Sequence, residues 1–176
     1  MSGPIIHPLA PLFDENSRIL ILGTMPSPKS RENGFYYAHP QNRFWRVLAS
    51  ICHEPTPSGN QERMEFCHRH HIALWDVLYA CRIDGAEDNS IRDPQPNDLR
   101  PILSQAPIQQ IFTTGTKASA LYKRYCLPTT GRPSVPLPST SPANCRFYTL
   151  ETLIAAYRIL VPYLEIHDEQ QPCTAG

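Results

Sequence analysis

Four short apolar segments recur along the chain, and between them apolar residues follow the three-to-four-residue spacing of helices. The apolar segments are continuous rather than alternating, which is typical of strands buried on both faces. We predict strands at residues 18–23, 72–78, 108–113 and 134–137, and helices at 39–51, 61–70, 98–104, 116–125 and 149–164. Strands that alternate with helices indicate a parallel sheet with helices on both faces.

The ends of these strands indicate where a binding site would form. Loops that leave the carboxyl ends of parallel strands meet at one edge of the sheet, where α/β proteins commonly bind ligands. Four segments should meet there: residues 24–27, the loop after Leu78, the turn 114–116 and the segment 138–143. We expect residues 1–167 to form one domain that begins with a Pro-broken lead-in, and residues 168–176 to form a disordered tail.

Charge is balanced overall, with 16 Lys and Arg against 16 Asp and Glu, but it is unevenly distributed. Residues 16–46 contain five basic residues and one acidic residue, and residues 99–150 contain six basic residues and no acidic one. If these two segments meet, they form a positive face of the kind that binds a phosphate backbone. Chance segregation of charge would give the same pattern, so charge alone does not decide the function.

The chain contains six cysteines, and no two of them form a Cys-x-x-Cys pair. This spacing argues against a zinc ribbon or an iron–sulfur cluster. We also reject a metal site at residues 67–71, Cys-His-Arg-His-His, because adjacent histidines on a helix point in different directions. The sequence shows neither a signal peptide nor an apolar stretch of membrane length. We therefore expect a cytoplasmic protein with free thiols, no metal and no cofactor.

Residues 23–45 contain the side chains best suited to chemistry. If His39 caps the helix that follows, Asn42 lies in its first turn, beside free backbone N–H groups. Helical side chains tilt toward the N-terminus, so the Asn42 amide would face the mouth of the site. Its carbonyl could then hold a water in line for attack on an oxocarbenium-like sugar. Alternatively, Asn42 only satisfies backbone donors at the start of the helix.

Two further motifs suit contact with nucleic acid. Phe35, Tyr36 and Tyr37 are adjacent aromatics, and a ring that faces the site would stack on a base for about 1–3 kcal/mol. Core packing is the alternative, and we expect one ring to face the site and another the core. The segment 137–144, Leu-Pro-Ser-Thr-Ser-Pro-Ala-Asn, is a short loop of hydroxyls between prolines, which could bond phosphates and enter a minor groove. A plain surface turn is its alternative interpretation.

Three motifs, at residues 23–27 (GTMPS), 34–45 (GFYYAHPQNRFW) and 137–144, together resemble the uracil-DNA glycosylase superfamily. They are most similar to its hypoxanthine-DNA glycosylase branch. The resemblance covers about residues 17–163, and the block 34–45 is its most specific part. It implies a single three-layer α/β/α domain with a central four-stranded parallel sheet, and a metal-free enzyme of base-excision repair. It also implies that residues 23–27 line the site and that residues 137–144 insert into DNA.

Two departures from related enzymes bear on the substrate. The mismatch-specific uracil and thymine glycosylases carry their catalytic Asn in the first loop, where this chain has Met25, whose thioether cannot orient water as an amide can. The hypoxanthine branch is understood to use the later Asn, which is Asn42 here. The main uracil enzymes also have a His where this chain has Leu137, so strong uracil excision is not expected. Tyr37 falls where relatives place the aromatic that stacks on the flipped base.

The residues and the resemblance together predict a monofunctional DNA glycosylase that acts on DNA as a monomer. It would flip a deaminated base, hypoxanthine above all, into a pocket and hydrolyse its N-glycosidic bond with a water held by Asn42. The alternatives are uracil or mixed specificity, or a non-catalytic nucleic-acid-binding module. Asp84 or Asn89 could add contacts to the base edge, or their segment could be a solvated loop. The predicted site comprises catalytic Asn42; base-binding Gly23, Thr24, Met25, Pro26, Ser27, Tyr37 and His39; and DNA-binding Lys117, Ser139, Thr140 and Ser141.

Overall fold

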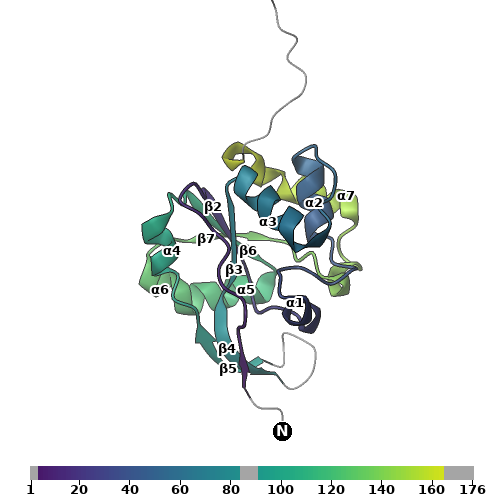
Figure 1. Ribbon diagram of the computed structural model, residues 1–176. Helices are drawn as coiled ribbons and strands as arrows, with labels where there is room; N and C mark the ends of the chain where they lie inside the picture. Colours follow the sequence, from purple (N-terminus) through teal and green to yellow (C-terminus); the bar gives the residue numbers. More distant parts are fainter. Residues whose placement is uncertain (1–3, 84–90, 165–176) are drawn as a thin grey trace, which may run out of the picture.

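The computed structural model describes residues 4–83 and 91–164, and a four-stranded parallel sheet forms its centre (Figure 1). The strand order is β3-β2-β6-β7, and each neighbouring pair is parallel. The strands are β2 (Ile19–Gly23), β3 (Ile72–Asp76), β6 (Gln110–Thr114) and β7 (Ser134–Leu137). The four predicted strands and their parallel arrangement are therefore confirmed, with ends that differ by no more than a few residues.

Successive residues of β2 face opposite layers of helices, which divides the core in two. Ile19 and Ile21 pack with residues of α2, α3 and α7, whereas Leu20 and Leu22 pack with residues of α4 and α5 (Figure 1). All four side chains are fully buried, which explains why this segment is apolar throughout. The three-layer α/β/α arrangement is confirmed. The helices span Phe44–Ile51 (α2), Gly59–Arg69 (α3), Arg100–Gln105 (α4), Thr116–Leu121 (α5) and Leu150–Tyr157 (α7).

A second sheet, antiparallel and of order β1-β4-β5, was not expected from the sequence. It is built from β1 (Ile5–Ile6), β4 (Leu78–Ile83) and β5 (Ile91–Pro96). The expectation of a loop after Leu78 is therefore wrong, because β4 begins at that residue and β5 follows it. The β5 sequence, Ile-Arg-Asp-Pro-Gln-Pro, has no strand signal, but its prolines are tolerated because β5 is an edge strand. Asp84 and Asn89, considered above as base contacts, lie outside the described residues.

A short helix, α1 (Pro28–Asn33), follows the segment 24–27 and was not among the predicted helices. Ser27 caps it by accepting a hydrogen bond from the backbone N–H of Ser30 at 3.1 Å. Pro28 occupies the first turn, and Gly34 ends the helix in a left-handed conformation. These are ordinary helix signals, but the helix is too short for an apolar repeat to show.

Two helix boundaries also differ from prediction. The helix expected from His39 begins at Phe44, because a turn occupies the preceding residues. The helix expected to end before Pro128 instead continues through the π-helical turn η2 (Tyr122–Cys126) into α6 (Leu127–Thr130). Pro128 is tolerated because it lies in the first turn of α6, where a missing N–H matters least.

At the C-terminal end, α7 and the 3₁₀ helix η4 (Arg158–Tyr163) agree with the helix predicted over residues 149–164. The predicted domain boundary at residue 167 and the tail 168–176 lie outside the described residues. Among the residues that are described, none of the helices has the length and apolar character needed to span a membrane.

Candidate active site

The carboxyl ends of three strands converge on Gly23, the last residue of β2. A Cβ atom on Gly23 would lie only 2.6 Å from Asp76 Oδ1, at the end of β3. It would also lie 3.4 Å from Tyr37 Oη and 3.7 Å from Thr114 Oγ1, at the end of β6. Only glycine allows this close approach without displacing a polar group. The sheet edge therefore brings together residues of the first loop, the aromatic segment and two neighbouring strands.

The first loop, residues 23–27, uses some of its backbone groups and leaves others unpaired. The carbonyls of Gly23 and Thr24 accept hydrogen bonds of 2.8 and 3.1 Å from the two amides that follow β3. The amides of Met25 and Ser27 have no acceptor within the described part of the chain. Unpaired backbone N–H groups are strong donors and suit the acceptors on the edge of a base. Thr24 and Pro26 are buried, Met25 is half-buried and Ser27 is exposed.

Asp76 is a buried carboxylate that the sequence analysis did not single out. Its Oδ2 lies 2.8 Å from Nε2 of His7, while Nδ1 of His7 accepts from the Leu9 amide at 3.1 Å. An imidazole that accepts at Nδ1 carries its proton on Nε2, so His7 donates to Asp76. Burial raises the pKa of Asp76, and the hydrogen bond from His7 opposes the rise. Asp76 Oδ1 has no hydrogen-bond partner among the residues described.

The aromatic segment divides between the core and the sheet edge. Tyr36 is buried, and its hydroxyl donates to the Ala10 carbonyl at 2.7 Å. Tyr37 is half-buried, and its ring stacks on Phe44 at 3.8 Å between centroids. Its φ of +52° is rare for a residue with a side chain of this size, which indicates that the surrounding structure holds its backbone in this conformation. One face of the Tyr37 ring is occupied by Phe44, so a base could stack only on the opposite face.

The turn at residues 39–42 places Asn42 just before α2. His39 closes this turn, with its carbonyl accepting from the Asn42 amide at 2.9 Å. The side-chain Oδ1 of Asn42 accepts from the backbone N–H of Phe44 at 3.0 Å and from Thr140 Oγ1 at 2.8 Å. A carbonyl oxygen has two lone pairs, so both are engaged. In this geometry Oδ1 satisfies protein donors, as the alternative interpretation anticipated, and does not present a free acceptor to a water.

Thr140 links the loop 137–144 directly to Asn42. Its side chain is 1% exposed, so the hydroxyl donates inward to Asn42 and cannot contact a phosphate as placed here. The Thr140 carbonyl accepts from the Arg43 amide at 3.2 Å. This arrangement corrects the expectation for Thr140, because a residue expected at the DNA surface instead lies against the predicted catalytic side chain.

The rest of this loop is also anchored. The Pro138 carbonyl accepts from Tyr157 Oη at 2.6 Å, and the Ser139 carbonyl accepts from Asn144 Nδ2 at 2.9 Å. Ser139 and Ser141 remain half-buried, so their contact with phosphate stays a prediction. The two anchored carbonyls lie directly before Thr140, and the bond between Ser139 and Asn144 spans it, so the loop is a preformed element.

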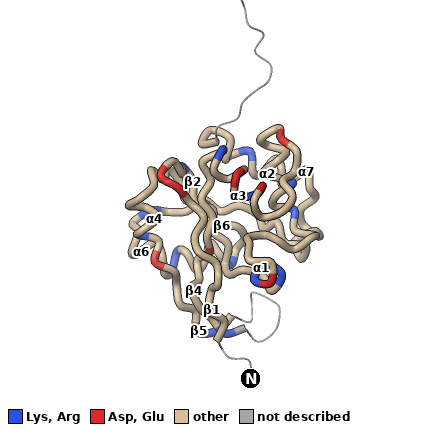
Figure 2. Tube along the Cα trace, viewed as in Figure 1, with Lys and Arg blue, Asp and Glu red and all other residues tan. Residues whose placement is uncertain are grey.

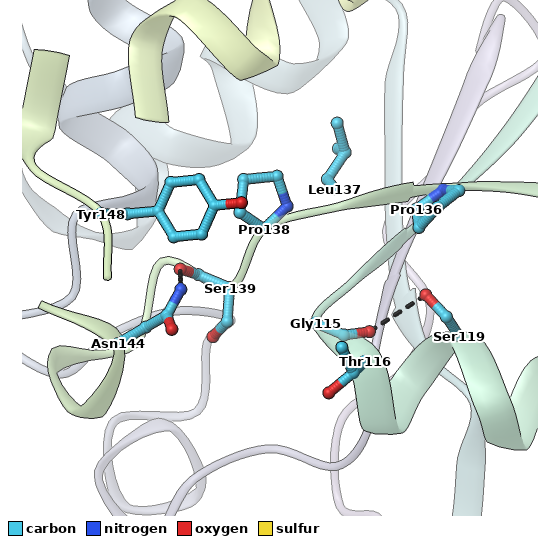
Figure 3. Close-up of a pocket in the computed structure, with 9 residues that line it drawn as sticks. All are labelled: Gly115, Thr116, Ser119, Pro136, Leu137, Pro138, Ser139, Asn144 and Tyr148. Carbon is cyan, nitrogen blue, oxygen red and sulfur yellow. Dashed lines mark hydrogen bonds between the residues drawn. The ribbon is translucent and has the colours of Figure 1, made fainter. Parts of the chain in front are cut away.

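A pocket of about 490 Å³ lies between the loop 137–144 and the start of α5 (Figure 3). Its volume falls within the range of small-molecule sites. In the close-up, the Tyr148 side chain points toward Pro138, and the Asn144 amide points to the Ser139 carbonyl. The pocket lining includes neither Asn42 nor a residue of the first loop. It does include Ser139, the neighbour of Thr140, so the pocket lies beside the predicted base site rather than within it. The lining residues are Gly115, Thr116, Ser119, Pro136, Leu137, Pro138, Ser139, Asn144 and Tyr148.

Basic side chains approach this edge from separate elements. Lys29 and Arg31 belong to α1, which carries charges of both signs (Figure 2). Lys117 is half-buried in the first turn of α5, where contact with DNA remains a prediction. Arg43 is buried, donates from Nη1 to the Tyr148 carbonyl at 2.5 Å, and forms no ion pair with any described carboxylate. An unneutralised buried cation makes the surroundings of the loop electropositive.

Sequence reasoning missed three residues that this geometry brings forward. His7 lies in a lead-in rich in proline, and its partner Asp76 is 69 residues away. The one local signal for Asp76 was a charged residue at the end of an apolar strand. Phe147 is 77% exposed, next to the exposed Arg146, in the segment before α7. A large exposed aromatic beside a basic residue is typical of a side chain that enters a base stack.

None of the described cysteines forms a disulfide bond, and all except Cys145 are buried. Burial raises the pKa of Cys52 to about 12 and that of Cys126 to about 11, so neither is a ready nucleophile. Within residues 4–83 and 91–164, no three His, Cys, Asp or Glu side chains gather as a metal site.

Comparison with known proteins gives consistent results. The family model of the uracil DNA glycosylase superfamily matches residues 10–160. A hypoxanthine DNA glycosylase of Methanosarcina barkeri is 40% identical over 114 residues, which cover 64% of this chain and 72% of that protein. A hypoxanthine DNA glycosylase of Methanosarcina acetivorans is 31% identical over 137 residues, which cover 77% of this chain and 86% of that protein. A solution NMR structure of a candidate uracil DNA glycosylase from Methanosarcina acetivorans has a TM-score of 0.73 at 32% identity, covering 87% of this chain and 96% of that one.

Proposed function

This chain belongs to the uracil DNA glycosylase superfamily, and we propose that it is a DNA repair glycosylase whose main substrate is hypoxanthine. It hydrolyses the N-glycosidic bond that joins a deaminated base to its deoxyribose. Both curated relatives described above carry the name hypoxanthine DNA glycosylase, which supports this substrate over others.

The observation that carries the proposal is the contact between the turn at residues 39–42 and the loop 137–144 at the carboxyl edge of the sheet. Asn42 and Thr140 are 98 residues apart in sequence, yet their side chains are hydrogen-bonded. The same edge holds the unpaired amides of the first loop, the Asp76 carboxylate and the Tyr37 ring. A donor set, an acceptor and an aromatic face are the elements needed to hold a flipped base.

In the proposed reaction, basic residues bind the phosphates, and the damaged nucleotide leaves the duplex at a cost of a few kcal/mol. The base stacks on the free face of Tyr37, and the amides of Met25 and Ser27 bond its acceptors. Asp76 Oδ1 accepts from a ring N–H of the base. Negative charge grows on the base as the glycosidic bond stretches, and the fixed donors stabilise it.

The exposed side chain of Phe147 gives the proposal a way to stabilise the open duplex. The loop 137–144 carries small and polar side chains, and its Thr140 is turned inward. Phe147 follows it within a few residues and is 77% exposed. We assign Phe147 the role of filling the gap that the flipped nucleotide leaves.

A preference for uracil is the second candidate, because the superfamily is named for uracil excision and one structural neighbour carries that description. Uracil, like hypoxanthine, presents a ring N–H next to a carbonyl, so Asp76 alone would not separate them. Leu137 stands where the main uracil enzymes have a His, which favours hypoxanthine. We further propose a monomer that works in the cytoplasm, consistent with the lack of a disulfide bond among the described cysteines.

The experiment is an excision assay on three duplex oligonucleotides that carry hypoxanthine, uracil or xanthine at one position. Alkali cleaves the strand wherever a base has been removed. We expect cleavage at hypoxanthine to be fastest. Asn42→Ala protein prepared in parallel should give little cleavage at any of the three bases. Faster cleavage at uracil would favour the second candidate. No cleavage on any duplex, with DNA binding retained, would favour a non-catalytic binding module.

A further inference from the structure

We propose that Asn42 acts in base excision as a hydrogen-bond donor, through Nδ2, and that Thr140 is the positioning residue that holds its amide in that orientation. This inference rests on the proposed function and changes the role of the amide. The sequence suggested an acceptor that holds water. The geometry points to a donor that stabilises charge.

The orientation of the Asn42 amide follows from its partners. Asn42 Oδ1 lies 3.0 Å from the backbone N of Phe44, which can only donate, so the atom that faces it is the oxygen. Turning the amide over would set two donors against each other. The Thr140 hydroxyl, at 2.8 Å from the same oxygen, then also donates. With both lone pairs of Oδ1 engaged, the carbonyl has no capacity left for a catalytic water.

The other end of the amide is free. Asn42 Nδ2 has no hydrogen-bond acceptor among the described residues, and the side chain is only half-buried. Its two N–H groups are therefore the unused bonding capacity of Asn42. The Arg43 side chain that follows is buried and forms no ion pair with a described carboxylate.

Thr140 is built to fix this orientation. It is 1% exposed, and besides donating to Asn42 it accepts from the Arg43 amide through its carbonyl at 3.2 Å. Two consecutive residues of the turn are thus held by one residue of the loop 137–144. Because neighbouring carbonyls of that loop are themselves anchored, the Thr140 hydroxyl cannot move far without breaking several bonds.

A donor suits the chemistry of this bond. When the C1′–N bond breaks, its electron pair leaves with the base, and the oxygen of a water bonds to C1′. The water loses one proton to solvent, and the base takes up a proton to leave neutral. Negative charge on the departing base is the part of this transition state that an N–H can stabilise. The oxocarbenium-like sugar reacts with a weakly activated water, so an acceptor is the lesser need.

Asn42→Asp separates donor from acceptor with almost no change in shape. A carboxylate oxygen still accepts from the Phe44 amide and the Thr140 hydroxyl, so the turn is kept, but both N–H donors are gone. We expect single-turnover release of hypoxanthine by Asn42→Asp to fall about 100-fold or more, to the level of Asn42→Ala. Asn16→Asp is the matched control. Asn16 is exposed just before β2, so this substitution adds the same charge at the amino edge of the sheet, opposite the site. We expect it to leave the rate unchanged.

Thr140→Val tests the positioning role by removing the hydroxyl at nearly constant volume. We expect about a 3- to 10-fold slower release of hypoxanthine, the effect of one lost hydrogen bond, with Thr140→Ser recovering most of the rate. Binding to a duplex with an abasic-site analogue should change less than twofold. In an Asn42→Ala background, Thr140→Val should cause no further loss, since it acts only through the amide. Thr129→Val, on the distant α6, controls for the substitution itself.

Three results would overturn the inference. Asn42→Asp protein that keeps more than a tenth of the wild-type rate would show that an acceptor suffices. Thr140→Val that slows release equally with and without Asn42 would give Thr140 a separate role. Wild-type protein that releases no base from any of the three duplexes would overturn the proposed function as well, whereas the first two results would leave it standing.

Discussion

The middle of strand β2 and its carboxyl end show how differently a fold and a site are encoded. In the middle, Leu20 and Ile21 are fully buried among apolar neighbours on the two faces of the sheet. At the end, Gly23 lies against a buried carboxylate, a tyrosine hydroxyl and a threonine hydroxyl. The middle therefore stabilises the fold through burial, and the end places polar groups where burial is costly. Substitutions should separate the two: one region should govern stability and the other excision.

The largest expected effect on stability comes from the middle of the strand. Leu20→Ala should lower the free energy of unfolding by about 2–5 kcal/mol, because it leaves a cavity in a closed layer of the core. Urea denaturation followed by circular dichroism measures this loss. The Leu20→Ala protein that remains folded at 20 °C should remove hypoxanthine at a rate close to that of the wild type. A variant with normal stability and no excision would contradict the division between the two regions.

At the carboxyl end, Tyr37→Ala should slow excision about 10-fold, since stacking of an aromatic on a base contributes about 1–3 kcal/mol. Tyr37→Phe, which keeps the ring and removes only the 3.3 Å contact with Thr114, should retain most of the rate. The measurement is single-turnover release of hypoxanthine, set beside binding to undamaged duplex. Equal losses in release and in binding would argue against a stacking role.

Asp76 links the two regions, because it serves the site and destabilises the fold. Its pKa is raised by burial, so the folded protein binds a proton that the unfolded chain has already lost at the same pH. The stabilising contribution of the protonated form is therefore complete below the ordinary pKa of Asp and is lost as pH rises through the folded pKa. Asp76→Asn cannot ionise, so its stability relative to wild type should increase as pH rises from 4 to 8, while its excision rate falls.

The measurement for Asp76 is urea denaturation of both proteins at several pH values. His7→Gln provides a partner control, because Gln replaces the imidazole but can still donate a hydrogen bond to the carboxylate. If the stability of Asp76→Asn relative to wild type fell as pH rises, this result would contradict a raised pKa for Asp76.

The smallest effect on stability is expected at the surface. Phe147→Ala should leave the free energy of unfolding within about 0.5 kcal/mol of wild type, because the side chain is 77% exposed. It should slow excision from duplex DNA several-fold and excision from single strands much less, since only a duplex leaves a gap to fill. If the variant removed hypoxanthine from duplex DNA as fast as the wild type does, Phe147 would have no part in the mechanism.

The sequence predicts the middle of the strand well because the signal is local. A continuous apolar run such as residues 19–22 shows burial on both faces without any knowledge of the partners. The ends of the helices and strands were less predictable. Helix α2 starts at Phe44 because a hydrogen-bonded turn precedes it, and the spacing of apolar residues gives no sign of that turn. Strand β5 was missed because its edge position tolerates prolines that normally exclude a strand.

The site was only partly predictable because its contacts are long-range. The motifs around Asn42 and at residues 137–144 could be recognised one by one, but not the bond between Asn42 and Thr140, 98 residues apart. The pairing of His7 with Asp76 likewise needs two segments that the second sheet brings together. Residue types therefore indicated the chemistry, and the fold was needed to show which atoms remain free to perform it.

The central claim is that the carboxyl edge of the sheet, with Asn42 at its corner, removes hypoxanthine from DNA. The most direct measurement is the single-turnover rate of hypoxanthine release from a duplex by wild-type and Asn42→Ala protein, each shown to be folded. We predict release by the wild type and a rate lower by about 100- to 1,000-fold in the variant. Equal rates for the two proteins, or no release by either, would contradict it.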